Sequence, residues 1–242
     1  MSEEPPSSNA APSRRGPKPS LSVERIVRAA IDLADAEGVD AVSMRRIAGE
    51  LGAGTMSLYR YVRSKEELVD LMVDTALGEG PEPGAPLEGW RQHVEWCARQ
   101  QWEVYLRHPW VLPLASTTRP SPSPTGILQM ERVLAAMENL GIDHASRLHM
   151  YLSVTGYVQG VAHLYAREVE AERRTGVTAG QWWESHDPVF ERIFATRDFP
   201  AIERFHWEGL DTVPEAWFEF GLQRLLDGFE ALIERERAGR SA

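Results

Sequence analysis

Apolar residues recur at intervals of three and four positions through most of this chain. Near its start they fall at Val23, Ile26, Val27, Ala30, Ile31 and Ala34. This spacing places apolar side chains on one face of a helix, whereas a strand needs an apolar residue at every second position. No convincing alternating pattern is found, so the sequence predicts an all-α fold.

Capping signals and glycines mark where the helices should begin and end. Ser43 is expected as an N-cap, Ser64 with Glu67 forms the pattern of a capping box, and Asp187-Pro188 resembles a helix start. Thr212 with Glu215 suits another start. The expected helices lie at 22–38, 43–52, from about 55, from 64, and at 88–107, 124–140, 143–172 and 213–237, with shorter ones near 179–185, 188–196 and 200–207.

Composition divides the chain into three parts. Residues 1–20 are rich in proline and serine and have almost no apolar anchor, so they should form a flexible arm. The run PEPGAPL at 81–87 separates the following helices from the rest. We therefore expect an arm at 1–20, a domain at 21–80 and a larger domain at 81–242, with a proline-rich mobile loop at 116–124.

Several classes of protein are excluded by what the sequence lacks. The one cysteine, Cys97, has no partner for a disulfide and no metal-ligand spacing around it. The sequence has no signal peptide or membrane span, which predicts a cytoplasmic protein without a membrane partner. HExxH, GxSxG, P-loop and GxGxxG motifs do not occur, so we expect no enzyme, no cofactor and no metal.

The charge is unevenly distributed. The chain has a net charge of -10, yet residues 14–65 contain ten Lys/Arg against six Asp/Glu. From residue 81 onward the balance is sixteen against twenty-three. The first part therefore remains a candidate for binding nucleic acid although the whole chain is acidic.

The stretch GTMSLYRYVRSKEEL at 54–68 brings two tyrosines and three cations close together. A short helix that ends at a glycine, then a turn and a second short helix, has the spacing of a helix-turn-helix, whose second helix enters the major groove of DNA. Leu58 and Val62 should face inward. Ser57, Tyr59, Arg60 and Tyr61 then remain for bases and phosphates, and Lys65 for a phosphate; the alternative is that the two tyrosines belong partly to the core, Tyr61 more than Tyr59.

The same residues resemble the DNA-binding domain of the TetR (tetracycline-repressor) family of bacterial transcription regulators. The block VSMRRIAGELGAGTMSLYRYVRSKEELVDLM and the preceding helix carry the resemblance over residues 21–75. It implies phosphate contacts by Ser43 and Lys65, and places Met56 and Arg60 at positions that vary with the operator. The residues that it implies on DNA are Arg45, Thr55, Met56, Ser57, Tyr59, Arg60 and Tyr61.

The end of the arm is basic as well. Arg14, Arg15 and Lys18 follow each other closely before the first helix. Such an arm either inserts into the adjacent minor groove or serves only as a solubilising tail, and the sequence does not decide between them.

Two later segments have apolar seams of the kind that helix bundles use. We expect them to form a homodimer interface of four helices, two from each subunit, because a palindromic operator presents two half-sites. Gly156 and Gly160 permit close approach of the helices. The alternative is that both seams serve the core of one chain. The seam residues are Tyr151, Val154, Val158, Val161 and Tyr165, and Phe218, Leu222, Leu225, Phe229 and Leu232.

All eight tryptophans follow residue 89, and the family resemblance implies an effector pocket in this part. The second domain also resembles the tetracycline-repressor type. At its metal-binding His and Glu positions this chain has Gly156 and Leu164, and at its drug-contacting His it has Ala115. An uncharged aromatic effector is therefore expected rather than a magnesium chelate. The expected pocket residues are Trp96, Cys97, Gln101, Met130, Leu134, Thr155, Gln159 and His163.

Together these features predict a homodimeric repressor that a small aromatic or hydrophobic effector releases from a double-stranded DNA operator. One alternative is a helix-turn-helix activator or architectural DNA-binding protein without an effector. The other is a ligand-binding or scaffolding protein that has lost its DNA role.

Overall fold

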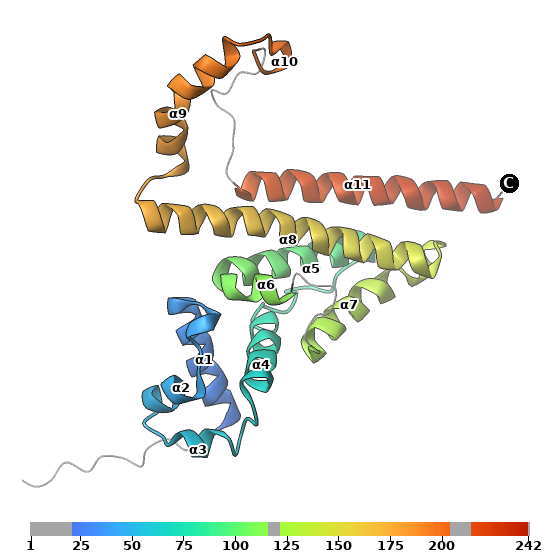
Figure 1. Ribbon diagram of the computed structural model, residues 1–242. Helices are drawn as coiled ribbons and strands as arrows, with labels where there is room; N and C mark the ends of the chain where they lie inside the picture. The colour runs from blue at the N-terminus through green and yellow to red at the C-terminus, as the bar shows by residue number, and fades with distance from the viewer. Residues whose placement is uncertain (1–20, 116–121, 204–213, 242) are drawn as a thin grey trace, which may run out of the picture.

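The computed structural model describes residues 21–115, 122–203 and 214–241, and within these ranges it is helical with no strand. The predicted all-α fold is confirmed. Helices α1 to α4 form a small domain at one end of the molecule, while α8 and α11 run side by side on the far side of α5, with α9 and α10 beyond them (Figure 1).

The small domain begins and ends its helices where short polar side chains and glycines allow. Ser22, Ser43 and Ser64 each accept a backbone N–H as the N-cap of a helix, and α1 ends at Gly38, whose φ is +86°. The elements are α1 (Val23–Glu37), the 3-10 turn η1 (Val39–Ala41), α2 (Met44–Glu50), α3 (Thr55–Leu58) and α4 (Lys65–Leu77).

The capping box predicted at Ser64 is only half formed. The Ser64 hydroxyl accepts the N–H of Glu67 at 3.1 Å, as expected. The Glu67 carboxylate accepts the N–H of Arg63 at 2.5 Å, one residue before the predicted donor. The helix is still closed at its N-terminus, because the carboxylate satisfies a neighbouring backbone donor.

The larger domain is built on α5, which packs against α7, α8 and α11. Trp102 of α5 stacks on Phe218 of α11 with ring centroids 4.6 Å apart, and its edge meets Tyr165 of α8. Its elements are α5 (Gly89–Arg107), η2 (Pro109–Val111), α6 (Leu112–Ala115), α7 (Pro124–Ala136), η3 (Glu138–Leu140), α8 (His144–Thr175), α9 (Ala179–Phe194), α10 (Pro200–Glu203) and α11 (Pro214–Ser241).

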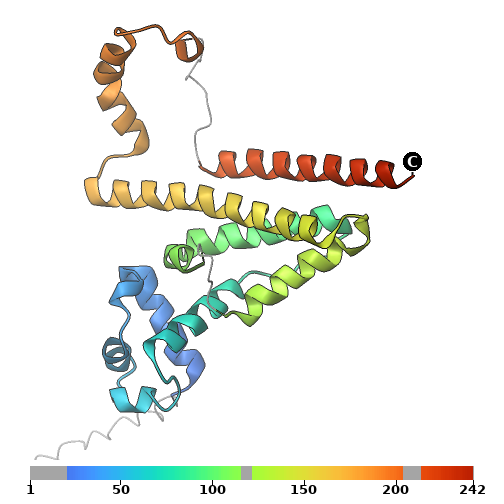
Figure 2. The same ribbon diagram turned by 45° about the vertical axis from the view of Figure 1, so that its right-hand side comes forward.

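The prediction of two short helices at 179–185 and 188–196 is wrong, because α9 is one helix with Pro188 inside it. Thr178 and Gln181 form a complete capping box that starts the helix early. Trp183 stacks on Phe190, and Phe190 on Phe194, so ring contacts join the turns on either side of the proline. In both ribbon views α9 and α10 extend away from the α8–α11 pair (Figures 1 and 2).

Some predicted features lie outside the described residues. These are the arm at 1–20, most of the loop at 116–124, the end of the expected helix at 200–207, and the proposed N-cap Thr212.

Candidate DNA-binding surface and effector pocket

Helix α3 is anchored by a few apolar side chains and presents the rest of its surface to solvent. Leu58 and Val62 are fully buried, as their spacing predicts. Met56 is 78% exposed, while Tyr59 and Tyr61 are 42% and 43% exposed. Both tyrosines are exposed rather than part of the core, because the helix ends at Leu58 and the chain turns there.

The remaining predicted groups of this surface differ in how firmly they are held. The Ser43 hydroxyl caps α2 by accepting the N–H of Arg46, and the half-buried Ser57 accepts a long hydrogen bond of 3.4 Å from Arg60. Thr55 begins α3 and is half-buried. Each hydroxyl thus lies near a helix N-terminus, where backbone N–H groups attract an anion.

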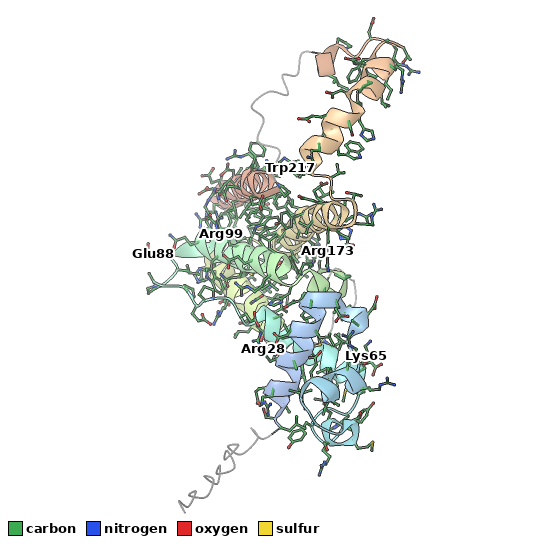
Figure 3. All side chains as sticks on the ribbon, turned by 90° about the vertical axis from the view of Figure 1, so that its left-hand side faces the viewer. Arg28, Lys65, Glu88, Arg99, Arg173 and Trp217 are labelled. Atoms are coloured by element: carbon green, nitrogen blue, oxygen red, sulfur yellow. The ribbon has the colours of Figure 1, made fainter. Side chains whose placement is uncertain are left out.

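Two neighbouring arginines on α2 differ in whether a carboxylate already neutralises their charge. Arg46 pairs with Glu37 through both of its terminal nitrogens, at 2.5 and 2.8 Å. Arg45 is exposed, and within the described part of the chain neither it nor Lys65 forms an ion pair. Figure 3 shows Lys65 on the outer side of the small domain, far from Trp217 on α11. Arg45 and Lys65 are therefore free to meet phosphates.

Arg14, Arg15 and Lys18 lie outside the described residues, so the two alternatives for the basic arm both remain.

Between α5 and α8, the larger domain encloses polar groups that its own side chains do not satisfy. Gln101 is 6% exposed and donates a weak 3.5 Å hydrogen bond to Cys97 Sγ, but its Oε1 has no hydrogen-bond partner in the described structure. Thr155 Oγ1 on α8 is also buried and has no hydrogen bond of good geometry, although the Tyr151 hydroxyl lies close enough to interact with it. Buried polar atoms without partners destabilise a protein by about 1–3 kcal/mol each, so they indicate a place where a ligand or water is accommodated.

Other polar side chains of α5 and α8 lie close to these two groups. Gln159 donates to Tyr105 Oη and to the carbonyl oxygen of Ala115, each at 3.4 Å. Burial raises the pKa of Cys97 to about 11 and that of Tyr151 to about 12, and it also raises the pKa of Tyr105. All three therefore stay protonated and uncharged at neutral pH. The structure brings together Cys97, Gln101, Thr155 and Gln159 of the predicted pocket.

The other predicted pocket residues lie elsewhere. Trp96 lines a second hollow of about 500 Å³ beside the 82–87 loop, with Arg132 over its ring at 5.7 Å and paired with Glu82. Met130 and Leu134 are half-buried on α7. His163 is exposed on α8, so it is neither a core histidine nor part of the enclosed group, because its position falls on the outer face of that helix.

The seam residues lie mostly inside one chain. Val154, Val158, Val161, Phe218 and Leu222 are buried among α5, α8 and α11, and a side chain already covered by its own chain has little area to give to a partner. Tyr151, Tyr165, Leu225, Phe229 and Leu232 are half-buried. For the buried five, the alternative that the seam serves the internal core is the correct one.

Sequence reasoning missed the contacts between the two domains. His108 ends α5 as its C-cap, is only 2% exposed and lies between Asp35 and Glu79. Asp74 of α4 accepts hydrogen bonds from Ser123 Oγ at 2.6 Å and from the N–H of Thr125 at 2.8 Å. No local pattern in the sequence marks such pairs, because the partners are dozens of residues apart.

Within the described ranges, no helix is long and apolar enough to cross a membrane, and no three His, Cys, Asp or Glu side chains are arranged to hold a metal ion.

Comparison with known proteins agrees with both halves of this arrangement. Residues 26–72 match the bacterial regulatory proteins of the tetR family, and residues 81–233 match the tetracyclin repressor-like C-terminal domain. The chain is similar to the HTH-type transcriptional repressor DrrR1 of Streptomyces coeruleorubidus, with 41% identity over 231 residues that cover 94% of this chain and 84% of DrrR1. It is also similar to an HTH-type transcriptional regulator of Saccharopolyspora erythraea, with 32% identity, covering 88% of this chain and 86% of the regulator.

Among solved structures, ActR of Streptomyces coelicolor in complex with actinorhodin superposes with a TM-score of 0.72 and 28% identity, covering 88% of this chain and 97% of ActR. The predicted family is thereby confirmed: the chain belongs to the TetR family of bacterial transcriptional regulators.

Proposed function

We propose that this chain, a transcriptional repressor of the TetR family, binds a palindromic DNA operator as a homodimer and leaves it when a small aromatic or hydrophobic effector enters the larger domain. The exposed surface of α3 is the observation that carries the DNA-binding part. Leu58 and Val62 are buried and fix the helix. The side chains of Met56, Tyr59 and Tyr61 are exposed to solvent. An apolar and aromatic outer surface flanked by unpaired cations suits a DNA groove between its phosphates.

The dimer face proposed here differs from the predicted seams. On α8, Leu148, Leu152, Gly156, Gly160 and Leu164 follow each other at steps of four and are all exposed. On α11 the exposed Trp217 and Phe220 border a hollow lined by Tyr157 and Val161 of α8. A stripe of apolar and glycine residues at constant helical spacing is suited to close contact with the same stripe on a second copy.

The effector part rests on the enclosed polar group between α5 and α8. A planar ligand with a hydrogen-bond donor would satisfy Gln101 Oε1 and Thr155 Oγ1, and the uncharged Tyr105 and Tyr151 offer no charge to attract an ion. One structural relative, ActR, holds actinorhodin. We infer the chemical class of this chain's effector from these polar groups alone.

Release follows from the position of α4 between the two domains. Asp74 ties α4 to the start of α7, and Gln129 of α7 donates to the carbonyl oxygen of Leu77 at 3.0 Å. A ligand that moves α5 and α7 would therefore move α4, and with it the recognition surface, away from the spacing of about 34–36 Å that successive half-sites need. The shift in the equilibrium is limited by how much more tightly the effector binds the released state.

Fluorescence anisotropy with DNA from the region flanking the chain's own gene tests the proposal, with a scrambled duplex as control. Tight binding that depends on sequence and falls steeply with salt is expected. A screen of aromatic compounds should then find one that weakens the operator complex without changing the dimer mass. A protein that binds the operator but responds to no ligand would be the activator or architectural alternative, and equal weak binding to both duplexes would favour the scaffolding alternative.

A further inference from the structure

One buried histidine joins the two domains through two carboxylates. His108 Nδ1 is 2.7 Å from Asp35 Oδ1 of α1, and His108 Nε2 is 2.8 Å from Glu79 Oε2, just after α4. His108 itself follows the last residue of α5. The ends of three helices from both domains thus meet at one imidazole ring.

Two hydrogen bonds to ionised carboxylates require a proton on each ring nitrogen. A neutral imidazole has one N–H donor and one lone pair, so it can donate to only one carboxylate and turns its lone pair toward the other. The protonated ring donates from both nitrogens. The arrangement in this structure is therefore the one that the imidazolium satisfies and the neutral ring does not.

The surrounding groups complete a small network. Arg28 and Arg107 approach Glu79 at 2.6 and 3.5 Å, and the indole N–H of Trp110 donates to Asp35 at 2.6 Å. Burial by itself would raise the pKa of Glu79, but the hydrogen bonds from His108 and Arg28 outweigh it and lower the pKa. Glu79 is thus ionised near neutral pH, and both arginines are about half exposed, whereas the ring of His108 is enclosed.

The network lies where it controls the recognition surface. Helix α1 packs against α4 and α2, and α2 packs against α3. Asp35 and Glu79 meet the end of α5 at His108, so their distance from its ring contributes, together with the contacts between α4 and α7, to how the small domain is oriented relative to the larger one. We expect a change of one hydrogen bond at the ring to rotate the small domain relative to the larger one as a rigid body, because packed helices move as units.

We infer that His108 is a positioning residue for operator binding: its protonated ring holds Asp35 and Glu79 together, and the small domain keeps its DNA-binding orientation through this tie. The inference rests on the proposed function. Operator affinity should therefore be higher when the ring carries its second proton and lower when it does not.

Two variants and one control test this. Glu79→Gln places an amide where the neutral ring can accept a hydrogen bond from its NH₂ group while Nδ1 still donates to Asp35, so the tie no longer needs the second proton. His108→Gln removes the ring. His149→Gln removes an exposed histidine of α8 and serves as the matched control. Operator affinity is measured by anisotropy at constant ionic strength between about pH 6 and about pH 8.5.

The wild-type protein and His149→Gln should lose affinity by about fivefold to tenfold across this range, as expected for the loss of a charge-assisted hydrogen bond. Glu79→Gln should bind with nearly constant affinity, and His108→Gln weakly at every pH. If Glu79→Gln keeps the wild-type pH profile, His108 has only a structural role and the inference is overturned. If the wild-type protein binds no operator at any pH, the proposed function itself fails. Circular dichroism verifies folding; should His108→Gln unfold, the Glu79→Gln profile alone decides.

Discussion

The two domains of this chain differ in how completely they satisfy their own groups. The small domain has a core of fully buried aliphatic side chains, such as Ile26, Ile47 and Leu68, and its polar groups are at the surface. Every buried side-chain polar atom that lacks a partner in the described structure lies in the larger domain, in Gln101, Arg147 and Thr155.

The exposed apolar residues differ in the same way. In the small domain they gather at α3, whereas in the larger domain they extend along α8, α9 and α11. A closed core can present a rigid surface to DNA, while a core with unsatisfied polar atoms and an uncovered apolar surface is suited to take in a ligand and a second subunit. This difference between the domains is the one that the proposed function needs, with a closed DNA-binding unit joined to a larger unit that would take in an effector.

The largest effect should come from opening the closed core. Leu58→Ala removes the buried anchor of α3 and should lower the free energy of unfolding by about 2–5 kcal/mol, together with operator binding. Tyr59→Ala, one residue on, should change stability by less than about 0.5 kcal/mol and still weaken binding, because its ring is exposed. Urea unfolding followed by circular dichroism, with anisotropy on the operator, distinguishes the two. Equal stability of both variants would mean that α3 is not anchored as described.

A second variant tests the uncovered surface of the larger domain. A side chain introduced at Gly160 of α8 would meet no other atom within 4 Å of its Cβ, so Gly160→Phe should leave the fold of each subunit intact. The ring should obstruct close contact of two α8 helices and weaken the dimer by about 1–3 kcal/mol. Gly180→Phe on α9 is the matched control, because that glycine also faces open space. Sedimentation at several protein concentrations measures the effect. An unchanged dimer in Gly160→Phe would place the interface elsewhere.

Local signals in the sequence were sufficient for much of the small domain. Ser22, Ser43 and Ser64 cap the helices that their positions predicted, and the spacing of Leu58 and Val62 identified the buried side of α3. These features depend on residues three or four apart, which is the range over which helix geometry is determined. The boundary at 81–87 remains a prediction on composition.

The larger domain was less predictable because its contacts are distant in sequence. The seam spacing placed Val154 and Val158 on one face of α8, and Leu222 on the seam face of α11. Spacing does not say whether such a face packs against its own chain or against a partner. His108 is held by residues 29 and 73 positions away, so no window of sequence could have marked it. Asp187-Pro188 resembled a helix start in the local sequence. The stacking of Trp183, Phe190 and Phe194 on either side of the proline exists only in the folded helix, so the sequence could not show it.

The unsatisfied core of the larger domain leads to a third test. Thr155→Val removes a buried hydroxyl that has no hydrogen bond of good geometry and only the nearby Tyr151 hydroxyl beside it, so the free energy of unfolding should rise by about 1–2 kcal/mol while the response of operator binding to an aromatic effector weakens. Ser153→Ala removes an exposed hydroxyl from the same helix and should change neither quantity. Thermal unfolding gives the first and an anisotropy titration the second. A loss of stability in Thr155→Val would show that its hydroxyl is already satisfied.

The smallest expected effect sharpens the description of the DNA-binding surface. Arg45 and Arg46 are adjacent and both exposed, but Glu37 holds Arg46 in a two-bond ion pair. Arg45→Ala should therefore weaken operator binding by about threefold to tenfold and lower the slope of log affinity against log salt by about one, the contribution of one phosphate contact. Arg46→Ala should weaken binding less, because its charge is already neutralised by Glu37 and little of it reaches a phosphate. If both substitutions reduce the salt slope equally, the ion pair opens on DNA, and the surface is assembled by the operator rather than presented ready-made by the closed core.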